Sequence, residues 1–182
     1  MFKLPYYGER GLEEGPRAMA ADPELFVGAL DQALHDVRRT VDVLASRPEV
    51  DARHIGITGI SLGGITAGTA AALEPRLSRA FLILAGGDLH TIIHHARETR
   101  DLSRLIRGLT PEKRASVDKA IDAVDPLKHA GALCSRAREG QVLMVNATQD
   151  EVIPPAVTSK LAKALGIADK VIWLDGLGHY TA

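Results

Sequence analysis

The stretch IGITGISLGG, residues 55–64, decides the fold: it is a short apolar run that ends in Gly-x-Ser-x-Gly. This pattern predicts a strand, a sharp turn and a helix, with the hydroxyl of Ser61 exposed at the turn. Such a tight turn requires residues without bulk two positions before and two positions after the serine, and Gly59 and Gly63 meet this condition. The small residues at 65–73 predict a helix whose free N-terminal N–H groups point toward the serine. The alternative for this pentapeptide is a glycine-rich connection without chemistry.

The composition describes a globular chain of 182 residues, 46% hydrophobic and 25% charged. A chain of this length can bury one core, so we expect a single domain over residues 1–182. A net charge of −1 argues against a nucleic acid or an anionic membrane surface as partner and favours a small molecule. The single Cys134 is expected to be a buried small hydrophobic residue. With no signal peptide or membrane-spanning run in the sequence, we interpret the protein as cytoplasmic.

The N-terminal part predicts a loop and then a long helix. Residues 2–19 are rich in Gly, Pro and charge, which is typical of a loop. Asp22 and Pro23 indicate a helix start. Apolar residues then recur at helical spacing over 25–46, which predicts an amphipathic helix lying on a sheet.

Four apolar runs predict strands, at 54–58, 80–85, 141–147 and 170–175. The second run is continuous, which is expected of a strand buried on both faces. Because the strands alternate with helices, the fold class is α/β, with a mostly parallel sheet flanked by helices. Ligands of such sheets bind beyond the carboxyl ends of the strands.

Residues 88–138 are too long for a plain crossover and predict a helical insertion. Helical stretches are expected at 89–107, 111–124 and 127–138. Since the insertion follows the carboxyl end of a strand, we interpret it as a lid that shapes a pocket and limits water.

Three histidines of the insertion, His90, His94 and His95, raise the possibility of a metal site because His90 and His94 are one helical turn apart. No carboxylate or thiol stands at matching spacing, and a metal needs a full set of ligands. We therefore expect no metal and no cofactor, and assign these side chains to solvent or to the mouth of the pocket.

Two further residues complete a candidate catalytic set with Ser61. Asp150 follows the third predicted strand and His179 follows the fourth, so all three meet at one edge of a parallel sheet. A serine hydroxyl needs a base, imidazole has suitable basicity, and a carboxylate fixes the imidazole tautomer. Glu151 and Asp88 are alternative acids, and the histidines of the insertion are alternative bases.

With these motifs the sequence resembles the α/β-hydrolase superfamily, in particular its serine hydrolases similar to dienelactone hydrolase and acetyl xylan esterase. The resemblance implies hydrolysis of carboxylic esters through an acyl-enzyme on Ser61, with the backbone N–H of Leu62 as one oxyanion donor. The serine at position 61, where a dienelactone hydrolase has cysteine, favours ordinary esters. The resemblance rests on LPYYGER at 4–10, GISLGG at 59–64, DEVIPP at 150–155 and GH at 178–179.

The sequence departs from that family at both ends. The family's segment like 4–10 follows the fourth strand of the sheet, and the earlier strands carry a loop, often His-Gly-Gly, that supplies the second oxyanion N–H. This chain also ends three residues after His179. We expect a truncated hydrolase whose strand 54–58 becomes a sheet edge, available for a homodimer. The predicted function is a serine esterase for short acyl groups; the alternatives are a catalytically silent fragment or binding module, and a peptidase of the same fold.

Overall fold

The structure is a computed structural model that describes residues 3–11 and 15–182. Its centre is a four-stranded sheet in the order β1-β2-β3-β4, with every neighbouring pair parallel. The strands are β1 Ile55–Ile60, β2 Leu77–Ile83, β3 Val142–Ala147 and β4 Ile172–Leu174. The predicted α/β class is confirmed, and the sheet order follows the chain order.

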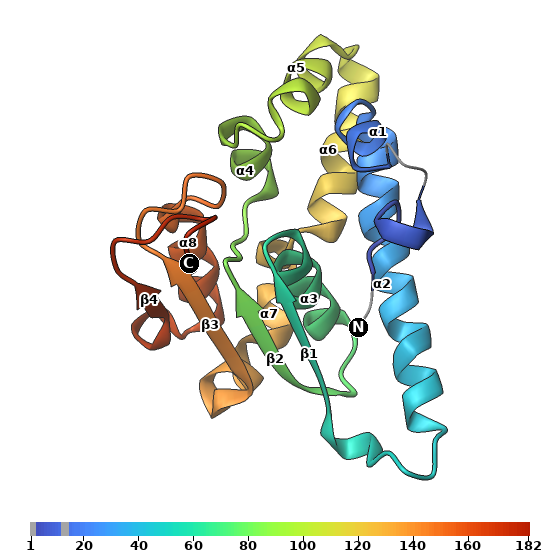
Figure 1. The fold of residues 1–182 in the computed structure, drawn as a ribbon, viewed down its shortest axis with the longest axis vertical. Helices are drawn as coiled ribbons and strands as arrows, with labels where there is room; N and C mark the ends of the chain where they lie inside the picture. The colour runs from blue at the N-terminus through green and yellow to red at the C-terminus, as the bar shows by residue number, and fades with distance from the viewer. Residues whose placement is uncertain (1–2, 12–14) are drawn as a thin grey trace.

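Helices pack on one side of this sheet, where α3, α7 and α8 lie together and α2 lies beside β1 (Figure 1). In addition to these helices, α1 precedes α2, and α4, α5 and α6 come between β2 and β3. The bounds are α1 Gly15–Ala20, α2 Pro23–Ala45, α3 Leu62–Leu73, α4 Leu89–His95, α5 Arg100–Gly108, α6 Pro111–Val124, α7 Pro126–Arg136 and α8 Pro155–Leu165.

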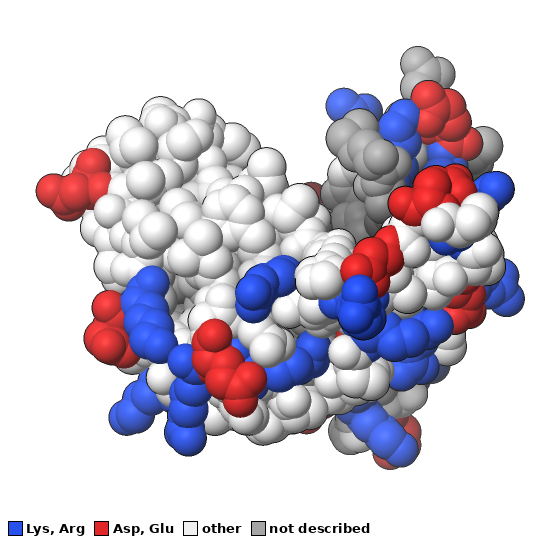
Figure 2. All heavy atoms as spheres, turned by 90° about the horizontal axis from the view of Figure 1, so that it is seen from below, with Lys and Arg blue, Asp and Glu red and all other residues white. Residues whose placement is uncertain are grey.

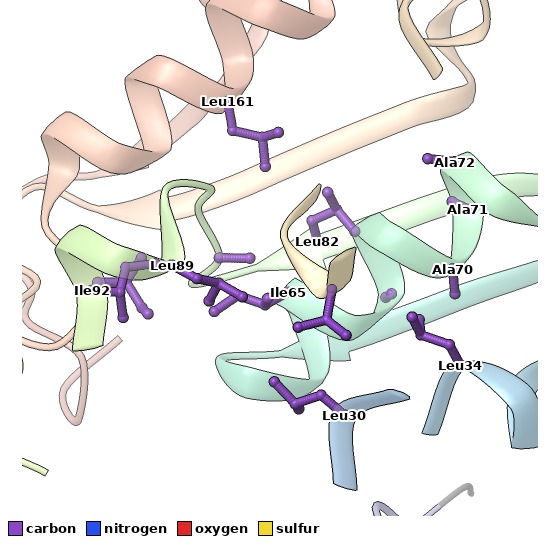
Figure 3. Packing of buried hydrophobic residues seen from close by; sticks show 14 of the residues in the cluster. Leu30, Leu34, Ile65, Ala70, Ala71, Ala72, Leu82, Leu89, Ile92 and Leu161 are labelled. Atoms are coloured by element: carbon purple, nitrogen blue, oxygen red, sulfur yellow. The ribbon is translucent and has the colours of Figure 1, made fainter. Parts of the chain in front are cut away.

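Helix α2 begins where the sequence predicts. The side chain of Asp22 accepts hydrogen bonds from the backbone N–H groups of Glu24 and Leu25, and Pro23 occupies the first turn. From the buried face of α2, Leu30 and Leu34 point toward α3, whose small residues allow the two helices to approach closely (Figure 3). Helix α3 is buried along most of its length, so the residues after Ser61 lie within the core.

The other face of the sheet carries apolar side chains that helices of the described chain do not cover. The pairing of the strands places four of them in one row, because paired residues of parallel strands point to the same face. At the two ends of this row Ile60 is 60% exposed and Ile172 is 48% exposed. We call this set the open-face row: Ile60, Ile83, Val145 and Ile172.

This arrangement corrects the prediction that the second strand is buried on both faces. In β2 burial alternates, with Ala80 and Leu82 buried toward the helices and Phe81 and Ile83 only half-buried. The continuous apolar run correctly indicates a central strand, but it carries no information about whether helices cover one face or both.

Three other expectations differ from the structure. Residues 15–19 of the predicted N-terminal loop lie in the helix α1, and residues 1–2 and 12–14 lie outside the described residues. The helix expected at 89–107 is two helices, because the chain turns extended at Ala96. Cys134 is half-buried rather than buried.

The surface is uneven in charge. Figure 2 shows a hollow between two lobes, with one lobe almost free of charged side chains and most charges gathered away from the hollow. Among the described residues, no helix is both long and apolar enough to cross a membrane.

Candidate active site

Ser61 lies in the sharp turn between β1 and α3. Its backbone has φ 56° and ψ −122°, a conformation that side chains disfavour and that indicates strain. The backbone N–H of Ser61 donates to the carbonyl of Ile83, at 2.9 Å, so the turn is tied to the neighbouring strand. As the residue that caps α3, Ser61 stands beside the first backbone N–H groups of the helix, including that of Leu62.

Two glycines make this turn possible, and only one of them, Gly59, is among the two that the sequence motif suggests. A Cβ at Gly59 would lie 2.1 Å from the carbonyl oxygen of Gly63, so no side chain fits there. A Cβ at Gly63 would meet nothing within 4 Å, which makes that part of the expectation wrong. The second tight position is Gly64, where a Cβ would lie 2.8 Å from the Cβ of Ala85. The first turn of α3 therefore presses Gly64 against β2 and turns Gly63 toward open space.

The three predicted site residues are brought together. His179 Nε2 lies 2.8 Å from Ser61 Oγ, and His179 Nδ1 lies 2.8 Å and 3.0 Å from the two carboxylate oxygens of Asp150. Because Nδ1 faces a carboxylate, the proton of the neutral ring belongs on Nδ1, and Nε2 is free to accept the serine proton. The side chains of His179 and Asp150 are only 7% and 0% exposed, so water screens their interaction little.

Asp150 is fixed by the backbone that follows it. Its Oδ1 accepts hydrogen bonds from the N–H groups of Val152, at 2.9 Å, and Ile153, at 2.7 Å. These bonds hold the carboxylate in place independently of its contact with the imidazole ring. They also provide the hydrogen-bond partners that a buried charge requires.

The alternative acids have other partners. The carboxylate of Asp88 pairs with Lys160 and accepts from the N–H of Thr91. Glu151 contacts His179 at its backbone: Oε2 accepts from the N–H of His179 at 3.0 Å. This hydrogen bond is the main cause that lowers the pKa of Glu151.

Tyr180 joins the loop of His179 to the helical insertion. Its hydroxyl donates to Glu98 at 2.7 Å, and this hydrogen bond is the main cause that raises the pKa of Tyr180 to about 12. Its ring meets the imidazole of His179 edge to face, with ring centroids 5.2 Å apart. Tyr180 and Glu98 are 82 residues apart, so the sequence offers no signal for this contact.

The histidines of the insertion make separate contacts. His90 lies 3.2 Å from a carboxylate oxygen of Asp122, and His94 Nδ1 lies 2.7 Å from the hydroxyl of Ser103. Partial burial is the main cause that lowers the pKa of His94. Across residues 3–11 and 15–182, no group of three or more His, Cys, Asp or Glu side chains is arranged to hold a metal ion.

A groove of about 1030 Å³ runs from Ser61 along the free edge of β1. Its opposite wall includes Val41 and Leu44 of α2, and Tyr7 of the N-terminal segment. Burial raises the pKa of the Tyr7 hydroxyl. The nucleophile candidate therefore opens onto a largely apolar cleft.

The sequence of this chain matches a known protein family. The sequence profile of the prolyl oligopeptidase family matches residues 30–175. That range includes Ser61 and Asp150 and ends four residues before His179. A search of curated proteins finds no match.

Solved structures similar to this chain include esterases and peptidases. An acetyl xylan esterase from Paenibacillus sp. R4 has a TM-score of 0.66 and 24% identity, over 88% of this chain and 50% of that one. The Pyrococcus horikoshii acylaminoacyl peptidase has a TM-score of 0.65 and 16% identity, over 96% and 27%. A puromycin-hydrolyzing peptidase of Mycobacterium tuberculosis has 0.64 and 21%, over 81% and 22%. The chain thus spans at most half the length of these proteins, and the likeness shows the shared α/β-hydrolase fold.

Proposed function

We propose that this chain, which belongs to the prolyl oligopeptidase family, is a serine hydrolase with Ser61 as nucleophile, His179 as general base and Asp150 as the acid that orients it. One observation carries the proposal. An unbroken series of hydrogen bonds runs from Ser61 Oγ through both ring nitrogens of His179 to the buried carboxylate of Asp150.

The reaction follows from this geometry. Nε2 of His179 takes the hydroxyl proton while Ser61 Oγ bonds to the acyl carbon of the substrate. The imidazolium then gives that proton to the leaving group as the bond to it breaks, which leaves an acyl-enzyme on Ser61. A water molecule repeats the sequence and releases the acid. Asp150 stabilises the imidazolium in both halves of the reaction.

The negative oxygen that forms on the acyl carbon needs hydrogen-bond donors. The N–H of Leu62 is the first of α3 and has no acceptor within the helix, so we assign it as one donor. Loss of a single oxyanion donor typically reduces the rate about 100-fold to 1000-fold. The source of a second donor therefore sets how active this chain is by itself.

We assign carboxylic esters of short acyl groups as substrates. The resemblance of the sequence motifs to acetyl xylan esterases and the structural likeness to one of them support this choice. A peptidase is the second candidate, supported by the family match and by the likeness to acylaminoacyl and puromycin-hydrolyzing peptidases.

A fluorophosphonate probe tests the nucleophile. We expect the intact protein to be labelled, and Ser61→Ala to lose labelling and to reduce turnover by roughly a factor of 10⁶. An unlabelled wild-type protein that is folded by circular dichroism would instead favour a catalytically silent module. Nitrophenyl esters of increasing chain length, measured beside aminoacyl anilides, then distinguish an esterase from a peptidase.

Two further assignments concern the surroundings of the site. Within the predicted insertion, residues 88–138, α7 packs with α3 and α8, so only the part before it, residues 88–125, is assigned as a lid, supported by the hydrogen bond between Glu98 and Tyr180 that joins it to the loop of His179. The exposed strand predicted at residues 54–58, which lies in the edge strand β1, is assigned as a surface where a second copy pairs. A monomer by light scattering at high concentration, with full esterase turnover, would contradict the pairing.

A further inference from the structure

Two neighbouring acidic residues hold different parts of His179. Asp150 contacts the imidazole ring, whereas Glu151 accepts a hydrogen bond from the backbone N–H at 3.0 Å. The ring of a histidine can take the right place only if its Cα is in the right place as well. The loop that carries His179 is half-buried to exposed and lies outside the helices and strands, so a contact with its backbone has a direct effect on the position of the ring.

The glycine before His179 allows this contact. A Cβ at Gly178 would lie 2.7 Å from Oε2 of Glu151 and 3.2 Å from the carbonyl oxygen of Gln149. The φ of Gly178 is not positive, so the backbone itself does not require glycine there. What the position requires is space, because the carboxylate of Glu151 must pass close to residue 178 to reach the next N–H.

We propose that Glu151 is a positioning residue for His179, and that Gly178 is present so that the Glu151 carboxylate can bind the His179 N–H. The hydrogen bond is charge-assisted, which makes it stronger than a neutral one. It acts on the Cα of His179, while Asp150 acts on the ring, and together they bring Nε2 to the hydroxyl of Ser61. This role rests on the proposed function, since it concerns the base of that reaction.

Two variants at position 151 and one control at another position test the role. We expect Glu151→Ala to lower kcat about 10-fold to 100-fold, as for loss of a hydrogen bond to a charged group, with KM changed less than about twofold. Glu151→Gln keeps an oxygen acceptor, so its kcat should recover to within about fivefold of wild type. Glu49→Gln changes an exposed glutamate in the turn before β1 and serves as the matched control, with wild-type kcat.

A double-mutant cycle tests the link between Glu151 and Gly178. Alanine at position 178 would meet the far end of the Glu151 side chain at 2.7 Å, which can move away, and the carbonyl oxygen of Gln149 at 3.2 Å, which must shift by a few tenths of an ångström, so we expect only a small decrease in Tm. It should nevertheless lower kcat nearly as much as Glu151→Ala, because the carboxylate leaves the N–H. In the Glu151→Ala background, Gly178→Ala should lower kcat by less than a further factor of about two.

The outcomes separate this inference from the proposed function. If the wild-type protein is not labelled by the fluorophosphonate, the proposed function fails. If it is labelled, and Glu151→Ala retains wild-type kcat or loses activity only in proportion to a lower Tm, the positioning role is overturned. Additive effects of Glu151→Ala and Gly178→Ala would overturn the link between the two residues.

Discussion

The turn of Ser61 and the loop of His179 reach the same hydrogen bond but are held in different ways. The turn is held by backbone: Ser61 bonds to Ile83 of the next strand, and Gly59 meets the carbonyl of Gly63 directly. The loop has a backbone bond to a neighbouring segment, from the N–H of Gln149 to the carbonyl of Leu177, but His179 and Tyr180 are held by side chains from distant parts of the chain. A backbone contact cannot be removed without moving β1 or α3, whereas side-chain contacts can be removed one at a time. Substitutions of the residues that hold the nucleophile should therefore mainly lower stability, and substitutions of the side chains that hold the base should mainly lower activity.

The largest effect on the His179 side is expected from Asp150→Asn. The amide can still accept from the N–H groups of Val152 and Ile153, so the fold should persist. It cannot favour the ring tautomer that leaves Nε2 free, and kcat should fall by roughly 10⁴. Turnover of a nitrophenyl ester and Tm, measured on the same sample, test this. Activity within tenfold of wild type would mean that other groups orient the ring.

The corresponding change on the Ser61 side is Gly59→Ala. The new Cβ would lie 2.1 Å from the Gly63 carbonyl oxygen, and because this is backbone it cannot swing away. We expect a loss of about 3 kcal/mol in the free energy of unfolding, at the upper end for an added methyl group, measured by urea denaturation.

Gly63→Ala is the matched control for that change. Nothing lies within 4 Å of its Cβ position, and alanine is favoured over glycine inside a helix by about 1 kcal/mol. The control should be as stable as the wild-type protein or slightly more stable. If the two variants lost equal stability, the distinction between the two glycines would be wrong.

The smallest effect is expected from Tyr180→Phe. It removes the hydrogen bond to Glu98 but keeps the edge-to-face contact with His179. Since the Tyr180 side chain is exposed, kcat should fall no more than about threefold and Tm should be unchanged. Glu98→Ala removes the acceptor of the same hydrogen bond and should match it. A loss of kcat larger than that of Glu151→Ala would show that the loop depends on its link to the insertion more than on Glu151.

The sequence predicts those parts of the molecule that local pattern determines. The cap at Asp22, the helical spacing after it and the Gly-x-Ser-x-Gly turn each depend on residues close together in the chain, and the structure confirms α2, β1 and α3. Strand order then predicts that Asp150 and His179 meet Ser61, because parallel strands end at one edge. The catalytic roles of these residues stay a prediction.

The remaining features depend on contacts that the sequence does not display. Which glycine is tight depends on how α3 sits against β2, so Gly64 could not be told from Gly63. The role of Glu151 depends on where the last loop of the chain folds back. The available signal was the glycine directly before the candidate catalytic histidine. By itself, this glycine does not indicate which side chain occupies the space beside it.

The open-face row has a consequence for the temperature dependence of stability. Ile60 and Ile172 are already exposed to solvent in the folded chain. Such apolar side chains add little to the heat-capacity change of unfolding, because unfolding exposes little more of their surface to water. The stability curve of this chain should therefore be flatter than that of a 182-residue protein with both sheet faces covered. A partner that covers the open-face row would remove apolar surface from water, so its association should show a negative heat-capacity change in calorimetry. The enthalpy of binding should then become more negative as the temperature rises.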